Sequence, residues 1–184
     1  MIEYERKNLN GVPDYTAAEF EGRRSDYCLL IPVINEGARI LTELGRAENA
    51  GINKICDIVI CDGGSTDGSM KHDILQLYHV NTLLTKTGPG KQGAQLRMGI
   101  YFALDRGYKG ILTIDGNNKD SIEDVSKFIE KLQAGYARQP LYPRRPCNQH
   151  AAGALCGGAA HPCAARQPWC APVVYRYHQR LPRL

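Results

Sequence analysis

The sequence lacks any apolar run that could cross a lipid bilayer, and its longest apolar stretch is about Tyr27 to Ile34. A transmembrane helix needs about 20 mostly apolar residues, so we expect none. The first residues are polar and include Glu3, Glu5 and Arg6, without the apolar segment of a secretory signal. We therefore expect a cytoplasmic protein, and a location at the inner face of the membrane stays open.

Acidic residues are missing from residues 137–184, which also lack lysine but contain seven arginines. The 23 basic and 19 acidic residues of the chain give a net charge of +4. All the acidic residues precede residue 137, so residues 1–136 carry a net charge of −3 and the tail carries +7. Because the positive charge belongs to the tail alone, we expect no nucleic acid partner for the folded part.

The tail from residue 137 also has no isoleucine and no regular apolar period, but holds seven of the ten prolines. Three interpretations stay open: a disordered segment, a zinc module and an aberrant, out-of-frame sequence. The wide cysteine spacings, without Cys-x-x-Cys, argue against zinc, and the cytoplasmic expectation argues against disulfides. The four cysteines of the tail are Cys147, Cys156, Cys163 and Cys170.

The out-of-frame interpretation explains the tail best. Read one nucleotide later, permitted codons for residues 174–183 can spell Tyr-Thr-Asp-Thr-Thr-Asn-Gly-Phe-Arg. Under the same shift, permitted codons for residues 138–151 can also spell ordinary protein sequence. We therefore hypothesise that the reading frame changes near Tyr136. Sequencing the gene across that codon tests the idea, and an intact frame in an independent isolate would contradict it.

Residues 27–136 alternate between short apolar runs and amphipathic segments. Strands separated by helices are typical of an α/β fold with a mostly parallel sheet flanked by helices. Residues 1–26 are polar and mixed, and we expect an irregular or partly helical lead-in there. The predicted strands are 27–34, 55–61, 80–84 and 110–114, and the predicted helices are 36–50, 67–78, 91–106 and 121–134.

The apolar spacing within the predicted helices also indicates which faces point inward. In each helix most of the inward residues are three or four positions apart. We expect the buried faces to contain Ile40, Leu41, Leu44 and Ala47; Met70, Ile74 and Leu77; Leu96, Ile100, Ala103 and Leu104; and Ile122, Val125, Ile129 and Leu132.

Polar groups follow three of the predicted strands directly. Residues 32–36 read Pro-Val-Ile-Asn-Glu, residues 62–67 read Asp-Gly-Gly-Ser-Thr-Asp, and residues 115–120 read Asp-Gly-Asn-Asn-Lys-Asp. Ligands of open α/β sheets bind beyond the carboxyl ends of the strands. Clustered carboxylates need a cation or another partner, and oxygen ligands suit Mg²⁺ or Mn²⁺ shared with substrate phosphates.

Some of these residues also have purely structural interpretations. Asp67 and Asp120 can cap the helices that follow them, and Glu36 can favour the N-terminus of its helix. Asp115 is harder to explain in this way, because it follows a buried strand and precedes a glycine rather than a helix. We therefore favour a functional role for Asp115.

The glycine-rich segment 87–93 is not a P-loop, because Thr85 and Gln92 occupy positions where that motif needs Gly and Ser or Thr. It still leaves the start of a helix open to an anion, with Lys91 and Arg97 nearby. A loop followed by a solvated helix face is the alternative. The Gly-x-Gly-x-x-Gly dinucleotide fingerprint is also absent from residues 63–68.

Taken together, these motifs resemble those of family 2 glycosyltransferases of the GT-A fold, over about Tyr27 to Tyr136. Residues 32–36 are similar to the family's Pro-x-x-Asn-Glu, and residues 62–69 to its Asp-Asp-Gly-Ser-Thr-Asp-x-Ser segment. Residues 90–94 resemble its glycine-rich stretch, and Asp115-Gly-Asn117 stands where the family has Asp-x-Asp. The subgroup that the chain resembles most is that of the dolichol-phosphate mannose synthase-like enzymes.

The resemblance implies inverting transfer of a sugar from a GDP- or UDP-sugar to an acceptor, with a polyprenyl phosphate as one acceptor class. It implies that Asp62 contacts the base or ribose, and that Asp115 and Asn117 hold Mg²⁺ or Mn²⁺ on the diphosphate. Gly63 replaces a family aspartate, and the amide of Asn117 replaces a second carboxylate. The donor-site residues that we expect are Pro32, Asn35, Glu36, Asp62, Gly64, Lys91 and Arg97.

The family places its catalytic base downstream of Asp-x-Asp, yet no acidic residue follows Glu130 in this sequence. The resemblance therefore implies an incomplete GT-A domain that retains donor-binding residues and transfers sugar poorly. Two alternatives stay open, namely a sugar-nucleotide nucleotidylyltransferase and a non-catalytic nucleotide-binding module. The first normally carries a basic, glycine-rich loop after its first strand, where this chain has Asn35-Glu36-Gly37.

Overall fold

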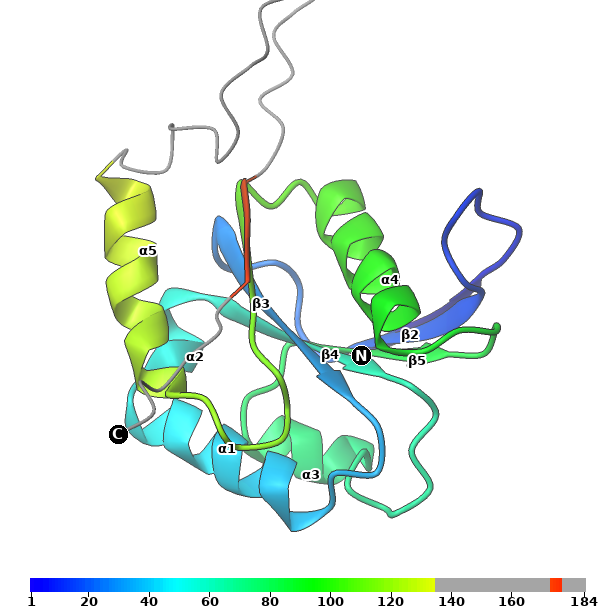
Figure 1. The fold of residues 1–184 in the computed structure, drawn as a ribbon, viewed down its shortest axis with the longest axis horizontal. Helices are drawn as coiled ribbons and strands as arrows, with labels where there is room; N and C mark the ends of the chain where they lie inside the picture. Colours follow the sequence, from blue (N-terminus) through cyan, green and yellow to red (C-terminus); the bar gives the residue numbers. More distant parts are fainter. Residues whose placement is uncertain (135–172, 177–184) are drawn as a thin grey trace, which may run out of the picture.

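The structure is a computed structural model that describes residues 1–134 and 173–176. It is an α/β fold with a seven-stranded sheet in the order β1-β2-β5-β4-β3-β6-β7 (Figure 1). The strands are β1 (Ile2–Arg6), β2 (Tyr15–Glu19), β3 (Tyr27–Val33), β4 (Asp57–Asp62), β5 (Thr82–Lys86), β6 (Gly110–Thr113) and β7 (Val173–Arg176).

Five neighbouring strands, from β5 to β7, run parallel, whereas β2 is antiparallel to both β1 and β5. The prediction of a mostly parallel α/β sheet is therefore confirmed. Val33 pairs with Asp62 in the β3–β4 register, and Leu30 pairs with Thr113 in the β3–β6 register. This alignment brings the carboxyl ends of the three strands to one edge of the sheet.

Helices cover both faces of the sheet. Figure 1 shows α4 on one side of the sheet and the other α-helices on the opposite side. All four predicted helices exist with adjusted ends, and α2 is an additional turn before β4. The helices are α1 (Ala38–Asn49), α2 (Ile52–Ile55), α3 (His72–Leu77), α4 (Gln92–Asp105) and α5 (Val125–Gln133), with a 3-10 turn, η1 (Ile122–Asp124), before α5.

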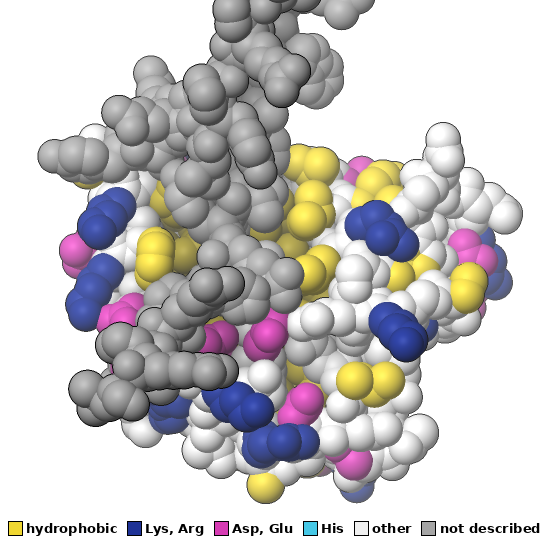
Figure 2. All heavy atoms as spheres, in the orientation of Figure 1, with side chains coloured by type: hydrophobic (Ala, Val, Ile, Leu, Met, Phe, Trp, Pro, Cys, Tyr) yellow, Lys and Arg dark blue, Asp and Glu magenta, His cyan; other side chains and the backbone are white. Residues whose placement is uncertain are grey.

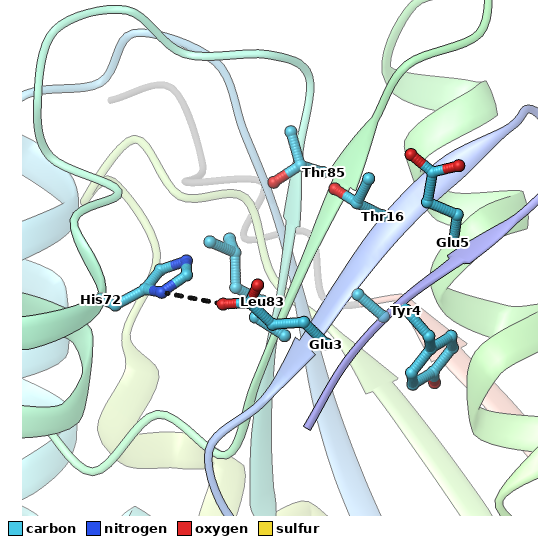
Figure 3. A pocket seen from close by; sticks show the side chains of 9 residues that line it. Glu3, Tyr4, Glu5, Thr16, His72, Leu83 and Thr85 are labelled. Atoms are coloured by element: carbon cyan, nitrogen blue, oxygen red, sulfur yellow. Dashed lines mark ion pairs between the residues drawn. The ribbon is translucent and has the colours of Figure 1, made fainter. Parts of the chain in front are cut away.

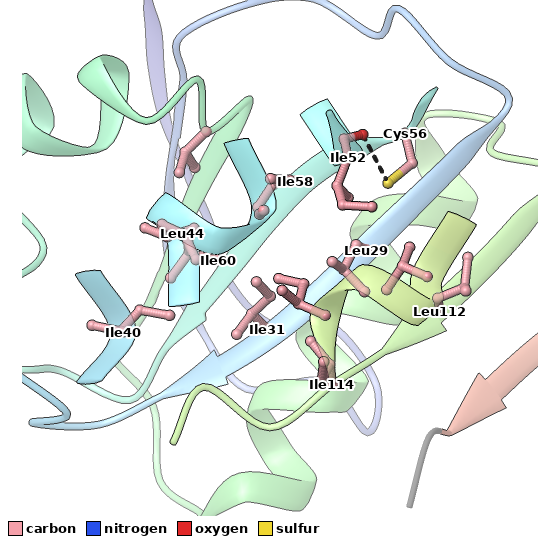
Figure 4. Packing of buried hydrophobic residues seen from close by; sticks show 14 of the residues in the cluster. Leu29, Ile31, Ile40, Leu44, Ile52, Cys56, Ile58, Ile60, Leu112 and Ile114 are labelled. Carbon is pink, nitrogen blue, oxygen red and sulfur yellow. Dashed lines mark hydrogen bonds between the residues drawn. The ribbon is translucent and has the colours of Figure 1, made fainter. Parts of the chain in front are cut away.

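The central strands are buried on both faces, which explains why they read as continuous apolar runs. In β3, Leu29 and Ile31 join the core under α1, α2, α3 and α5, while Cys28 and Leu30 join the core under α4. Figure 4 shows the first of these clusters, in which Ile40 and Leu44 of α1 pack over the strands. Burying each such side chain contributes about 1.5–3 kcal/mol.

The expected irregular lead-in over residues 1–26 is corrected by the structure, which has a β-hairpin there. Strand β2 pairs with β5, and β1 pairs with β2 at the edge of the sheet. Arg106, at the end of α4, anchors the hairpin by donating to the Glu19 carboxylate and to the Tyr4 hydroxyl. The side chains of β1 are mostly exposed, so its sequence shows little of the alternation that marks a half-buried strand.

Two of the predicted helix faces are wrong in part. In α4 the sheet contacts come from Ala94, Gln95, Met98, Gly99, Phe102 and Ala103, while Leu104 is 46% exposed. The buried face of α4 is therefore rotated about the helix axis relative to the predicted face. Gly99 allows this orientation, because a Cβ there would lie 2.5 Å from Cys61 Sγ. In α3 the buried residue is Leu75, and Leu77 is exposed. The predicted faces of the helices over 36–50 and 121–134 are confirmed in most positions.

Strand β7 pairs in parallel with β6. The rest of the tail, and with it the disordered, zinc and out-of-frame interpretations, lies outside the described residues. Within residues 1–134 and 173–176, no helix combines the length and apolar character needed to span a membrane. Figure 2 shows basic and acidic side chains interspersed on the visible face, so neither charge forms a continuous patch on its coloured part.

Candidate functional site at the carboxyl edge of the sheet

A cavity of about 530 Å³ opens where β3, β4 and β6 end. Pro32 and Glu36 reach it from β3 and the following loop, and Gly63 reaches it from the end of β4. Asp115 and Asn117 line it after β6, and Lys91 lines it just before α4. Its size suits a small-molecule ligand. Five of the nine site residues expected from the sequence therefore share one cavity: Pro32, Glu36, Lys91, Asp115 and Asn117.

Asp115 and Asn117 present oxygen atoms from a loop that β3 holds closely. A Cβ at Gly116 would lie 2.9 Å from Val33 Cγ2 and 3.2 Å from the Pro32 carbonyl, so only glycine fits there. Asp115 Oδ1 accepts a hydrogen bond from Gln92 Nε2 at 2.8 Å, and Asn117 Oδ1 accepts one from the Lys119 N–H at 3.1 Å. Each oxygen retains a second lone pair for a ligand.

The donor set is compatible with a divalent cation that shares its shell with a substrate. Within residues 1–134 and 173–176, no group of three or more His, Cys, Asp or Glu side chains is placed to hold a metal ion alone. Mg²⁺ typically uses one or two protein carboxylates together with phosphate oxygens and water. Asp115 and Asn117 could supply the protein share of such a shell.

The lining of the cavity also carries positive charge. Lys86 and Lys91 both line it, and Lys86 Nζ donates to the Gly88 carbonyl at 2.8 Å. The N-terminus of α4 follows directly after Lys91, and its partial positive charge favours an anion. The lining of the cavity thus combines carboxylate and amide oxygens with cationic groups, as a metal-bound polyphosphate would require.

Asp62, Asn35 and Gly64 shape the edge of the site without lining the cavity. The Asp62 carboxylate is buried and accepts from the Ser65 N–H at 2.9 Å and the Ser65 hydroxyl at 2.6 Å. Asn35 Oδ1 accepts from the Thr66 N–H at 2.8 Å. Gly64 has a φ of +96°, which a side chain would strain. These contacts fold residues 62–66 into a tight turn between β4 and the end of β3.

Asp67 and Glu36 both make contacts near the start of α1. Asp67 does not cap α3, which starts at His72; its Oδ2 accepts instead from the Gly37 N–H, at the start of α1, at 2.8 Å. Hydrogen bonds from Ser69, and that from Gly37, hold the pKa of Asp67 below its usual value. Glu36 lines the cavity and pairs with Arg39 at 2.9 Å.

Arg97 lies outside the cavity lining, contrary to the expected anion contact. Its Nε donates to the Gly11 carbonyl at 2.9 Å, in the turn of the β1–β2 hairpin. On the same side, the Asp14 carbonyl accepts from the N–H groups of Thr87 and Gly88. The hairpin therefore supports the glycine-rich loop before α4, and Arg97 contributes to that support.

Gln95 is a site residue that the sequence analysis missed. It is 3% exposed and lines the cavity, and its Nε2 donates to the carbonyls of Val33 at 2.6 Å and Cys61 at 2.9 Å. It therefore joins the ends of β3 and β4. A Cβ at Gly63 would lie 2.8 Å from this amide, which explains the absence of a side chain at position 63. Only the position of Gln95, three residues after Gln92 at the start of α4, hints at the role.

We expect Gly63→Ala to destabilise the fold by about 1–3 kcal/mol, because the new methyl group displaces an amide that satisfies two carbonyls. In a Gln95→Ala background the same substitution should cost clearly less, giving a favourable coupling energy in a double-mutant cycle. Urea unfolding measures all four proteins. Gly22→Ala is the matched control, since nothing lies within 4 Å of its Cβ. Equal penalties for Gly63→Ala in both backgrounds would contradict the proposed contact.

Glu43 is a second residue that the sequence did not reveal. It lies on the buried face of α1 with no exposed surface, and its Oε2 accepts from the Asn118 N–H at 3.0 Å. Its Oε1 has no hydrogen-bond partner among the described residues. Burial raises the pKa of Glu43 to about 7, and the nearby carboxylates of Asp120 and Asp115 add to the rise, while Asn118 and Arg46 oppose it.

A second cavity, of about 370 Å³, lies on the hairpin side of the sheet and is less suited to catalysis. Figure 3 shows its lining from β1, β2 and β5, with Glu3 facing His72 of α3. That ion pair spans 3.6 Å and is well exposed. The lining residues lie along the strands rather than at their carboxyl ends, so the 530 Å³ cavity is the better candidate site.

No protein-family model matches the sequence, and a search of curated proteins finds no significant match. Interpretation of the site therefore depends on its geometry and on the motifs that form it.

Proposed function

We propose that this chain is the donor-binding part of a family 2 glycosyltransferase of the GT-A fold, and that it binds a GDP- or UDP-sugar with Mg²⁺ or Mn²⁺. One observation carries the proposal: Asp115, Asn117 and Glu36 share a cavity with Lys91 at the carboxyl edge of a parallel sheet. The resemblance of the motifs around these residues supplies the family.

In this proposal the diphosphate contacts Lys86, Lys91 and the loop after β6, which share the lining of the cavity. Asp115 and Asn117 would hold the metal, which would supply positive charge beside the leaving diphosphate. Lys86 and Lys91 attract the phosphate oxygens, and Asp62 keeps the turn after β4 in place beside the nucleoside. Glu36 is held near the diphosphate by its ion pair with Arg39.

The proposal assigns no catalytic base. Enzymes of this family place a carboxylate base downstream of Asp-x-Asp, and no acidic residue follows Glu130 in these 184 residues. We therefore expect donor binding without efficient transfer. A membrane-bound acceptor such as a polyprenyl phosphate belongs to the proposal only through the family resemblance.

Isothermal titration calorimetry of the 184-residue chain with GDP-mannose, UDP-glucose, GDP and UDP tests the proposal. We expect saturable binding of one nucleotide series in Mn²⁺, and at least about a tenfold loss in EDTA. No binding of either series would contradict the proposal, and metal-independent binding would favour a simple nucleotide-binding module. A transfer rate equal to that of a frame-corrected chain would contradict the expected loss of transfer.

A further inference from the structure

The loop after β6 is fixed from two opposite sides. On one side Gly116 presses against β3, with its N–H 3.4 Å from the Pro32 carbonyl. On the other side lies α1, alongside which the chain after β6 runs in Figure 1. Two side chains of α1, Glu43 and Arg46, make the contacts on that second side.

Glu43 holds the loop through its backbone. Its carboxylate accepts from the N–H of Asn118, a residue in the left-handed conformation with a φ of +59°. Asn tolerates that conformation better than most residues, but it is still uncommon. A carboxylate in a fully buried position carries a large desolvation cost. A leucine at the same position of the core face would avoid this cost, so packing alone does not account for Glu43.

Arg46, one turn further along α1, holds the side chain of Asn118 and the end of the same loop. Its Nη1 donates to Asn118 Oδ1 at 2.7 Å and to the Asp120 carbonyl at 3.3 Å. Its Nε and Nη2 form a two-pronged pair with the Glu123 carboxylate, at 2.8 and 2.6 Å. Bidentate arginine–carboxylate pairs fix geometry well.

We propose that Glu43 and Arg46 are positioning residues that set the separation of Asp115 and Asn117, and so the affinity of the cavity for a metal–nucleotide diphosphate complex. The inference rests on the proposed function of the cavity. Neither residue lines the cavity, so both act through Asn118 and the loop. Partners that orient metal ligands typically change metal affinity by about 10–100-fold when they are removed.

The test compares Glu43→Leu, Glu43→Gln and Arg46→Met in the 184-residue chain. Calorimetry with Mn²⁺ and GDP, and with Mn²⁺ and UDP, gives the affinity, while urea unfolding at pH 8 gives the stability. We expect Glu43→Leu and Arg46→Met to weaken binding about 10-fold or more. Glu43→Gln keeps an oxygen that accepts from Asn118 and should stay within about threefold of the wild type. Thr42→Ala, an exposed change on the same helix, is the matched control.

The stability of the variants separates positioning from a merely structural role. Leucine suits a buried site, so Glu43→Leu should lose affinity while its unfolding midpoint is unchanged or higher. Wild-type affinity in both Glu43→Leu and Arg46→Met would overturn the inference but leave the proposed function intact. A wild type that binds neither nucleotide would overturn both. If Glu43→Leu does not fold, the affinity of Arg46→Met alone tests the inference. The Arg46 side chain is partly exposed, so we expect this variant to fold.

Discussion

Asp115→Asn is expected to weaken Mn²⁺-dependent nucleotide binding by about 100-fold or more while leaving the fold intact. The substitution removes the only carboxylate of the Asp115–Asn117 pair and keeps the size of the side chain. An amide oxygen can still accept from Gln92 Nε2, and the residue is half-buried rather than fully buried. A divalent cation, however, binds a neutral oxygen much more weakly than a carboxylate.

Calorimetry with Mn²⁺ and the preferred nucleotide measures this effect, with urea unfolding to check the fold. Asp73→Asn is a suitable control, because Asp73 is an exposed residue of α3 and does not line the cavity. Wild-type affinity in Asp115→Asn would place the metal elsewhere, while loss of binding in both variants would indicate a general effect of charge.

The second large effect concerns the pH dependence of stability. The pKa of Glu43 rises from 4.5 to about 7 in the folded chain. Between these two pH values the folded state therefore still binds a proton that the unfolded state has released. The contribution of Glu43 is therefore fully present below about pH 4.5 and is lost as the pH rises through 7. At about 1.4 kcal/mol for each pKa unit, the loss amounts to about 3 kcal/mol.

This loss should disappear in Glu43→Gln, which has no titrating group at position 43. Urea unfolding at half-unit steps from pH 4 to 8, in EDTA, gives the difference in unfolding free energy between the wild type and the variant. The charged groups that act on Glu43 are Arg46, Asp115 and Asp120, and all three remain in the variant. A constant difference across this range would contradict the raised pKa.

The central strands could be predicted because burial on both faces makes them apolar throughout. The runs over β3, β4 and β6 stop at polar residues, and the parallel order of the sheet then brings Glu36, Asp115 and Asn117 to one edge. The sequence therefore indicates the position of the site through two adjacent features, an apolar run and the polar residues that directly follow it.

The hairpin and the exposed side of α4 could not be predicted in the same way. Strand β1 exposes most of its residues, so no buried period marks it. In α4, Gln95 and Gly99 occupy the face against the sheet, while apolar residues such as Leu96 and Leu104 lie partly outside. Close backbone packing at a glycine and hydrogen bonds from a buried amide leave no apolar pattern in the sequence.

Glu43 and Asp62 show the same limit within the site. A glutamate among core positions of α1 looks like a solvent-facing residue until the fold places Asn118 opposite it. Asp62 stood in the motif that pointed to a nucleotide, and the structure shows it buried with Ser65 as its partner. The contact of Glu43 joins residues far apart in sequence, and the burial of Asp62 depends on the strands on either side of it, so the fold is needed to assign both roles.

The most direct measurement is a crystal structure of the chain with Mn²⁺ and GDP or UDP, using anomalous scattering to locate the metal. A single strong anomalous peak is expected within about 2.0–2.5 Å of side-chain oxygens of Asp115 and Asn117, with diphosphate oxygens completing its shell on the side of Lys91. A metal in the cavity near Glu3 and His72, or a nucleotide bound away from the ends of β3, β4 and β6, would contradict the proposed donor site.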